Sequence, residues 1–254
     1  MPWRETIDSY RILVSEIMLQ QTQVSRVEEK YPKFIKAFPN FKALDRTQPA
    51  KVYGVWQGMG YNRRALALKK TAHIVVNDYK STLPKTHEEL CALPGIGKAT
   101  ASSIMAFAFN LPAVFVETNI RTVFIHFFFK NRKKVADEEI LPLVEQSLYK
   151  KNPRVWYWAL MDYGAMLKKS GEDKNIRSKH YKKQGRFEGS RRQKRGKILK
   201  ILFDCNGLNI KEMCDRLKVT SEGKKKVKRE EIKVIVDELI LEGMVREEKG
   251  RYFL

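Results

Sequence analysis

Leu93-Pro94-Gly95-Ile96-Gly97-Lys98 connects residues 88–92 to a run that is typical of a helix from 97 to 109. The two glycines, two positions apart, permit a tight turn and a close approach of the backbone to a ligand. A helix that begins here presents unpaired N–H groups and the positive end of its dipole, which hold an anion such as phosphate. Lys98 adds a positive charge. We therefore predict a phosphate-binding turn at Gly95, Ile96, Gly97 and Lys98, with an ordinary turn between helices as the alternative.

Helical periodicity dominates the first two thirds of the chain. Tyr10, Leu13, Val14 and Ile17 follow the i, i+3, i+4, i+7 spacing of one buried helix face. No sustained strand alternation appears, so the layout is all-α. Pro84 and Thr86 open a further short helix, with Glu89 placed for a capping box. The other predicted helices cover residues 27–38, 52–56, 65–75, 97–109, 119–129, 137–148 and 153–167.

The pattern changes in the last quarter of the chain. Three helices are expected at residues 197–203, 209–217 and 228–242. Two short strands, 244–247 and 251–254, then flank Lys249-Gly250, which suits a tight turn. Three helices followed by a small hairpin is the order of a winged helix. The expected domains are an all-α core of two helical subdomains (1–167), a basic linker (168–196) and a small winged-helix-like α+β domain (197–254).

The charge of the chain points to a polyanion partner. Its 254 residues carry a formal net charge of +21, with a pI of about 9.8. Residues 168–200 hold fourteen Lys or Arg against three acidic residues, a net +11. Nucleic acid is the leading candidate for the partner, and a membrane surface is the weaker one. The basic segment is either a solvated hinge or an arm that follows phosphates and makes binding depend strongly on salt.

Several classes of protein are excluded by what the chain lacks. No apolar run approaches the roughly 20 residues that span a bilayer, and the first residues include no apolar signal stretch. The three cysteines, Cys91, Cys205 and Cys214, have no C-x-x-C spacing. They cannot build a zinc site or an iron–sulfur cluster, so no cofactor is expected.

Glu16 is a candidate general acid. It lies in the stretch 10–23 (YRILVSEIMLQQTQ), off the main apolar stripe, with Ile12 and Leu19 as helical neighbours. Apolar surroundings disfavour the carboxylate, so the pKa of Glu16 should be raised toward neutrality, as a general acid requires. The alternative is an ordinary exposed glutamate on a helix.

Glu117 is the second candidate carboxylate. It follows Phe115-Val116 and directly precedes a predicted helix, whose N-terminus should stabilise the anion. An anion held there could stabilise a cation that develops on a sugar, whereas the simpler interpretation is a capping residue. We therefore expect the two environments to drive the pKa values of Glu16 and Glu117 apart, as in a site with one acid and one ion.

These stretches together resemble the helix-hairpin-helix (HhH-GPD) DNA glycosylases, and most closely the adenine-specific branch that removes adenine opposite 8-oxoguanine. The most specific match is Ser15–Val24 (SEIMLQQTQV), nearly residue for residue. The supporting stretches are Pro2-Trp3-Arg4, residues 56–61 (WQGMGY), Arg63-Arg64-Ala65, residues 93–98, residues 161–166 (MDYGAM) and residues 187–197.

The resemblance implies hydrolysis of an N-glycosidic bond without a metal. Glu16 would protonate the departing adenine, and Glu117 stands where the family places a catalytic aspartate that stabilises the sugar cation. Arg4 would contact the flipped base. Gln21 and Thr22 would read or fill the space around the opposite base, and Tyr61 would wedge at the lesion. Flipping costs a few kcal/mol, which such contacts offset.

The chain departs from the family pattern at several positions. Glu117 is one methylene longer than the usual aspartate. Ala99 replaces the Schiff-base lysine of bifunctional relatives, and Asn62 replaces an aromatic residue. The four cysteines of the iron–sulfur loop are missing after Met166, and the basic run 168–183 stands there instead. We expect Lys168, Lys169, Lys182 and Lys183 to contact DNA phosphates in place of that loop. The tail, residues 197–254, is too short for the larger domain that recognises 8-oxoguanine.

Three functions remain open from the sequence. The first is an adenine glycosylase acting on adenine mispaired with 8-oxoguanine or guanine. The second is a thymine or uracil mismatch glycosylase of the same superfamily, and the third is a catalytically weak protein that binds duplex DNA. In each case we expect a monomeric intracellular protein, cytoplasmic or associated with the nucleoid, whose partner is double-stranded DNA with a mismatched or damaged base pair.

Overall fold

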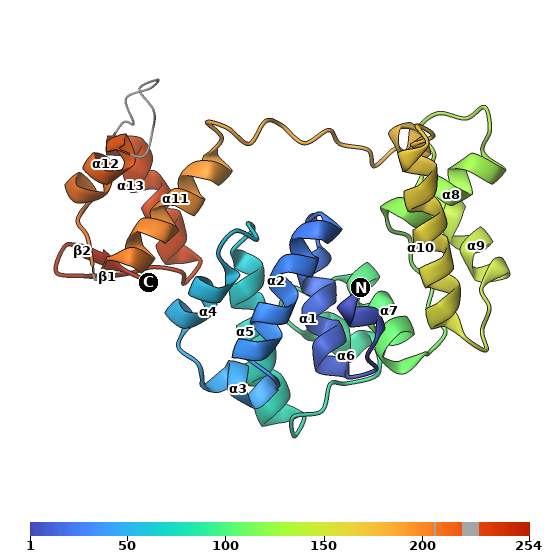
Figure 1. The fold of residues 1–254 in the computed structure, drawn as a ribbon, viewed down its shortest axis with the longest axis horizontal. Helices are drawn as coiled ribbons and strands as arrows, with labels where there is room; N and C mark the ends of the chain where they lie inside the picture. Colours follow the sequence, from blue (N-terminus) through green and yellow to red (C-terminus); the bar gives the residue numbers. More distant parts are fainter. Residues whose placement is uncertain (206, 220–228) are drawn as a thin grey trace. The chain divides into compact units, whose positions relative to one another are not determined.

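Helices carry almost all of the secondary structure in the computed structural model, which describes residues 1–205, 207–219 and 229–254 (Figure 1). This confirms the expected all-α core, because strands occur only near the end of the chain. None of the helices in these ranges is long and apolar enough to cross a bilayer. The chain forms two units, each built from two stretches of sequence: residues 1–17 with 82–184, and residues 18–81 with 185–254.

The first unit is a set of helices that includes both candidate carboxylates. Helix α1 (Ser9–Leu19) starts in this unit, and its last two residues belong to the second. The other elements are η1 (Pro2–Arg4), α6 (His87–Ala92), α7 (Lys98–Phe109), α8 (Thr118–Phe128), α9 (Asp137–Ser147), α10 (Pro153–Lys169) and η2 (Lys174–Arg177).

Helices α8 and α10 pack closely side by side (Figure 1). Gly164 of α10 makes this possible, since a Cβ at that position would lie 2.3 Å from the carbonyl oxygen of Asn119 in the first turn of α8. Aromatic rings fill the space behind: Phe115 stacks on the fully buried Tyr157, with ring centroids 4.1 Å apart, and Phe107 packs edge-on against both. The absence of a side chain at Gly164 therefore allows the first turn of α8 to approach α10 closely.

The second unit combines a helical part with a helix-and-hairpin part. Its helical part has α2 (Val24–Ala37), α3 (Phe41–Arg46), α4 (Pro49–Trp56) and α5 (Arg63–Asp78). The remainder has α11 (Arg191–Asp204), α12 (Ile210–Val219), α13 (Arg229–Leu241), β1 (Arg246–Glu248) and β2 (Arg251–Phe253).

Contacts between α11, α13 and the helical part hold the second unit together. The ring of Phe203 on α11 lies against Gly54 of α4, where a Cβ would come within 2.6 Å of it. Glu242, just after α13, accepts hydrogen bonds from Arg63 of α5 and Arg195 of α11, each at 2.5 Å. Apolar packing and a shared carboxylate thus join these elements.

The C-terminal elements confirm the expected winged-helix order. Strands β1 and β2 pair antiparallel, with Glu247 opposite Tyr252. The turn between them places Lys249 at φ +49° and Gly250 at φ +75°, the left-handed pair that a tight two-residue hairpin needs. Lys228, the expected first residue of the last helix, lies outside the described residues.

Two differences from the expected local structure concern α3 and the basic segment 168–196. Helix α3 has no counterpart among the predicted helices; it is short, and the Asn40 side chain caps it by accepting the N–H of Ala43. Helical structure also occupies both ends of the segment 168–196, because α10 continues to Lys169 and α11 begins at Arg191, capped by Ser190. Between them η2 packs on α8. The high charge of this segment does not prevent helical structure, because η2 packs on α8 and the Ser190 side chain caps α11.

Replacing Gly164 by Ala should destabilise the protein by about 3 kcal/mol, because the new methyl group would overlap backbone atoms of α8 that cannot rotate away. Gly196→Ala is the matched control: this glycine is also helical, and a Cβ there meets nothing within 4 Å. The control should be neutral or slightly stabilising. Urea unfolding of the two variants measures the difference, and equal midpoints would contradict the close approach.

Candidate active site

Glu16 projects from α1 toward helix α7. The hydroxyl of Ser103 donates a 2.6 Å hydrogen bond to Oε2 of Glu16 and also approaches the carbonyl oxygen of Thr100 at 3.0 Å. Ile12, one turn earlier on α1, is buried. Burial raises the pKa of Glu16 to about 7, Ser103 opposes that rise, and the charge of Glu117 adds to it. The predicted rise in the pKa of Glu16 is confirmed.

A hydrogen-bonded loop positions Glu117. The hydroxyl of Tyr157 on α10 donates to the carbonyl oxygen of Ala113 at 2.7 Å and accepts the N–H of Phe115 at 3.3 Å. This fixes the segment that leads into α8. Glu117 is the N-cap residue of α8, and its Oε1 accepts the N–H groups of Asn119 at 2.7 Å and Ile120 at 2.8 Å. The prediction of a capping position at a helix N-terminus is confirmed.

The predicted direction of the Glu117 pKa is wrong. Burial raises it, although the N–H groups of Ile120 and Asn119 and the charges of Lys168 and Arg121 favour the anion. Lys168 lies close because its ammonium donates a 2.6 Å hydrogen bond to the side-chain oxygen of Asn119. Burial of Lys168 also lowers the pKa of its ammonium, and Glu117 counteracts this. Desolvation, which depends on how α8 and α10 pack, outweighs the local contribution of the helix end.

The first unit brings the two carboxyls together although about a hundred residues separate them along the chain. Their proximity follows from the contribution of the Glu117 charge to the raised pKa of Glu16. Their partners differ: a single hydroxyl for Glu16, but two backbone N–H groups and a nearby ammonium for Glu117. A proton shared by the pair should therefore reside on Glu16, and the negative charge on Glu117.

The predicted phosphate-binding turn has the expected backbone. Gly95 takes φ +79°, which an L side chain rarely adopts, and Gly97 is the N-cap residue of α7. A Cβ at Gly97 would meet no atom within 4 Å, so its surroundings are open to an external group. Gly95, Gly97 and Lys98 are exposed, while Ile96 is buried and anchors the turn. Phosphate binding by these four residues stays a prediction.

The guanidinium of Arg4 is held by an acidic and an aromatic side chain of the first unit. Its guanidinium makes a bidentate pair with Asp162 of α10, at 2.7 and 2.9 Å, and lies over the ring of Trp158, 5.6 Å from its centroid. Together with Trp158 and Arg154 it lines a cavity of about 420 Å³. The Arg4 guanidinium is thus already paired with Asp162, and its contact with a flipped base stays a prediction.

The remaining base-reading candidates belong to the second unit, around the buried Arg64. Its guanidinium donates to the carbonyl oxygens of Met18 and Gln20 and, at 3.0 Å, to the hydroxyl of Thr22. Tyr61, at φ +46°, is partly exposed and lies over the same guanidinium. Arg64 therefore contacts both the turn that contains Thr22 and the turn that contains Tyr61.

Gln21 is exposed and takes φ +52° next to Thr22, so its side chain is presented outward. The Tyr61 hydroxyl accepts a 3.1 Å hydrogen bond from Arg192 on α11, and Arg192 also donates to the carbonyl oxygen of Gly185. This links the start of the C-terminal segment to the predicted wedge. The roles of Gln21, Thr22 and Tyr61 in reading DNA stay predictions.

The four candidate lysines of the basic run have different surroundings. Lys169, Lys182 and Lys183 are exposed, as phosphate contacts would require. Lys168 is only partly exposed and faces Asn119 near Glu117, so it belongs to the electrostatic setting of the carboxyl pair.

Sequence reasoning missed Ser103 and Arg192. A signal for Ser103 existed: it is a serine inside the apolar helical run 101–109, where a hydroxyl needs a partner. Nothing local marks Arg192, because its partner Tyr61 is distant along the chain.

The donor set of the chain does not fit an iron–sulfur cluster. The cysteines are free; Cys91 lies on α6 of the first unit, and Cys205 and Cys214 lie in the second. Three thiolates are fewer than the four that such clusters use. Among the described residues, His, Cys, Asp and Glu form no group of three or more that could hold a metal ion.

Comparison with known proteins shows what the chain is similar to. It is 37% identical over 170 residues to the adenine DNA glycosylase of Buchnera aphidicola subsp. Baizongia pistaciae, covering 66% of this chain and 48% of that protein. It is 34% identical over 128 residues to the thymine/uracil-DNA glycosylase of Methanothermobacter thermautotrophicus, covering 50% of this chain and 58% of that protein. The chain thus spans about half the length of the curated adenine glycosylases that it matches.

Similarity to solved structures leads to the same fold. The structure of a thermostable thymine-DNA glycosylase aligns with a TM-score of 0.58 at 30% identity, over 65% of this chain and 78% of that one. The family described as HhH-GPD superfamily base excision DNA repair protein matches residues 14–146, more than half of the chain. That region contains Glu16, the turn at 93–98 and Glu117. The chain belongs to the HhH-GPD superfamily of base excision DNA repair proteins.

Proposed function

We propose that this protein is a monofunctional DNA glycosylase that removes adenine mispaired with 8-oxoguanine or guanine. The observation that carries the proposal is the pair of electrostatically coupled carboxyls, Glu16 and Glu117, one with its pKa raised to about 7 and the other at a helix N-terminus. The similarity to several adenine DNA glycosylases favours adenine as the base.

In the proposed reaction Glu16 acts as the general acid. As the bond between the sugar C1′ and the adenine nitrogen breaks, its electron pair moves to the base, and Glu16 gives its proton to a ring nitrogen of that base. A carboxyl with a pKa of about 7 is about half protonated at neutral pH and is a strong enough acid to transfer the proton.

Glu117 carries the negative charge that the second part of the reaction needs. Loss of the base leaves a cation on the sugar, which the Glu117 carboxylate stabilises until water adds to C1′ and releases a proton. Both hydrogen bonds from α8 reach Oε1 of Glu117, so they hold the carboxylate without occupying Oε2. Ala99 removes the lysine that a Schiff-base route would use, which makes hydrolysis the expected outcome.

Further residues would bind the substrate. We assign a backbone phosphate to the turn at 95–98 and other phosphates to Lys169, Lys182 and Lys183. Arg4 would contact the extruded base, Gln21 and Thr22 the opposite base, and Tyr61 the disturbed stack. The division into a core (1–167), a basic segment (168–196) and a C-terminal domain (197–254) is part of this proposal, as is action by a monomer on cellular DNA.

A thymine or uracil mismatch glycosylase is the second candidate. The similarity to a thymine/uracil-DNA glycosylase and to the solved thymine-DNA glycosylase favours it. The same carboxyl pair could serve a different base, because the Glu117 anion would act on the sugar, which these nucleosides share. Glu16 would then give its proton to a carbonyl oxygen, since thymine and uracil offer no basic ring nitrogen.

The decisive assay uses four duplexes, with A opposite 8-oxoguanine, A opposite G, T opposite G and U opposite G. Alkali cleaves the abasic sites, so strand scission identifies the excised base. We expect scission of the two duplexes that contain adenine. Glu16→Gln should reduce excision at least about a hundredfold and keep DNA binding, because it removes the acid at constant volume. Tight binding without scission in any duplex would instead indicate a protein that only binds DNA.

Ser103→Ala should shift the pH profile. The Ser103 hydroxyl favours the Glu16 carboxylate, so its loss should raise the pKa of Glu16 above about 7. The decline of the single-turnover excision rate on the alkaline side should then move to higher pH. Ser102→Ala is the control, since this buried neighbour takes no part in the hydrogen bond to Glu16. Superimposable profiles for the two variants would rule out Glu16 as the titrating acid.

Glu16→Gln should also stabilise the fold at alkaline pH. The pKa of Glu16 rises from its ordinary 4.5 to about 7 on folding, so ionisation costs stability as the pH rises from 4.5 to 7, and the full cost applies above 7. Glutamine cannot ionise. The free energy of unfolding of the variant should therefore exceed that of the parent by up to about 3 kcal/mol near pH 8. Near pH 4 the two values should match. Urea unfolding at both pH values measures this, and a constant difference would contradict a raised pKa.

A further inference from the structure

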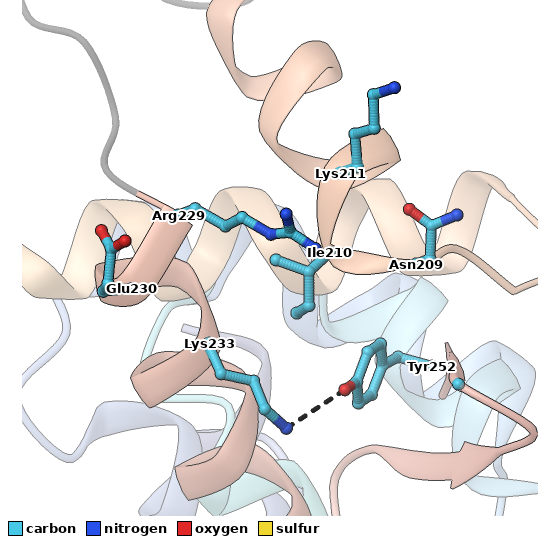
Figure 2. Close-up of a pocket in the computed structure, with 8 residues that line it drawn as sticks. Asn209, Ile210, Lys211, Arg229, Glu230, Lys233 and Tyr252 are labelled. Carbon is cyan, nitrogen blue, oxygen red and sulfur yellow. Dashed lines mark hydrogen bonds between the residues drawn. The ribbon is translucent and has the colours of Figure 1, made fainter.

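A cavity of about 630 Å³ opens in the C-terminal part of the second unit (Figure 2). Its walls come from the start of α12, the start of α13 and the hairpin that joins β1 and β2. The lining residues are Asn209, Ile210, Lys211, Arg229, Glu230, Lys233, Gly250 and Tyr252. None of them belongs to the residues assigned above to catalysis or to base reading.

The cavity has a fixed apolar floor. Ile210 and Tyr252 are both buried, at 8% and 4% exposure. The backbone of Tyr252 exchanges two hydrogen bonds with Leu208, at 2.9 and 3.1 Å, and its hydroxyl accepts one from Lys233 at 3.1 Å. Figure 2 shows this last contact between two of the residues that line the cavity. These backbone and side-chain hydrogen bonds hold Tyr252 in place.

The rim of the cavity is cationic. Lys211, Arg229 and Lys233 contribute three positive charges and Glu230 one negative charge. Figure 2 shows the Arg229 side chain extending toward Ile210, whereas the Glu230 carboxylate points away from it. Within the described parts of the chain, neither Lys211 nor Arg229 has an ion-pair partner, and Lys233 is paired with Asp237. The beginnings of α12 and α13 add the partial positive charge of helix N-termini.

Two other acidic residues of α13, Glu231 and Glu238, do not reduce this charge, because they pair with residues of α11. Glu231 pairs with Lys194, and Glu238 pairs with Arg191 and Arg195. Glu231 and Glu238 of α13 are therefore neutralised by α11, while Arg229 at the start of the helix has no ion-pair partner among the described residues.

We propose that this cavity binds the sugar–phosphate backbone of duplex DNA, as a second DNA contact that acts independently of base excision. Lys211 and Arg229 would pair with phosphate oxygens, and the apolar floor at Ile210 and Tyr252 would receive the deoxyribose. Backbone contacts of this kind add affinity without reading sequence, and each neutralised phosphate adds about 0.9 to the salt slope of binding. The C-terminal domain thereby tethers the enzyme to undamaged DNA.

The test measures binding of the full chain to a lesion-free duplex by fluorescence anisotropy over a series of KCl concentrations. The variant is Lys211→Glu with Arg229→Glu. The matched control is Lys200→Glu with Arg216→Glu, which makes the same change in charge at exposed positions of α11 and α12 outside the cavity. Every variant keeps the four lysines between residues 220 and 228, so a difference reports on the cavity.

The cavity variant should bind at least about tenfold more weakly than the control and lose one to two units of the salt slope. If the cavity variant and the control lost the same amount of DNA affinity, the effect would follow from net charge alone, and the proposal would be overturned. A stronger effect on single-stranded than on duplex DNA would overturn the choice of ligand. Lys211→Ala with Arg229→Ala, which adds no repulsion, should show the same order of effect and tests the proposal if the reversal variant fails to fold. Excision by a saturating amount of any variant should be unchanged, which separates this result from the proposed catalysis.

Discussion

The placement of one carboxyl, that of Glu16, against helix α7 is the constraint on which the proposed chemistry depends. In water this group would be ionised at neutral pH and could not serve as an acid. Burial raises its pKa to about 7, and Ser103 supplies a single hydrogen bond that limits the rise. Such a group works against the stability of the fold whenever it ionises, so the rest of the first unit must hold α1 and α7 in contact despite that cost.

The second carboxyl is held in the opposite manner. Glu117 sits at the end of a loop fixed by Tyr157, and two N–H groups of α8 hold one of its oxygens. Its position depends on how closely α8 approaches α10, which Gly164 permits. Lys168 reaches the same helix start through Asn119. Two residues of one helix, a glycine and a lysine, thus set the place and the electrostatic surroundings of the anion.

Local patterns were enough to predict most helices and the turn at 93–98. The periodic positions Tyr10, Leu13, Val14 and Ile17 are all buried, and Gly95 takes the positive φ that its sequence context indicates. The direction of the Glu16 pKa was predictable from its apolar neighbours on α1, whereas the burial against α7 that accompanies it was not.

Properties that depend on distant residues were not predictable. The pKa of Glu117 is raised by packing between helices that the capping signal does not report. Ser103, Lys168 and Arg192 gain their importance from partners at least 49 residues away along the chain. The order in the basic segment also escaped prediction, since η2 is held by α8 and α11 starts at a cap formed by Ser190. Charge composition alone does not reveal such tertiary contacts.

Helix α7 combines two features within a short length. Its first residue, Lys98, follows the open glycine turn, and Ser103, five residues later, contacts Glu16. At about 1.5 Å per residue, a rigid rod of roughly 7.5 Å separates the two points. Helix α7 therefore fixes the distance between an anion bound at its start and the carboxyl of Glu16. Changes in the neighbouring loops would not alter that distance.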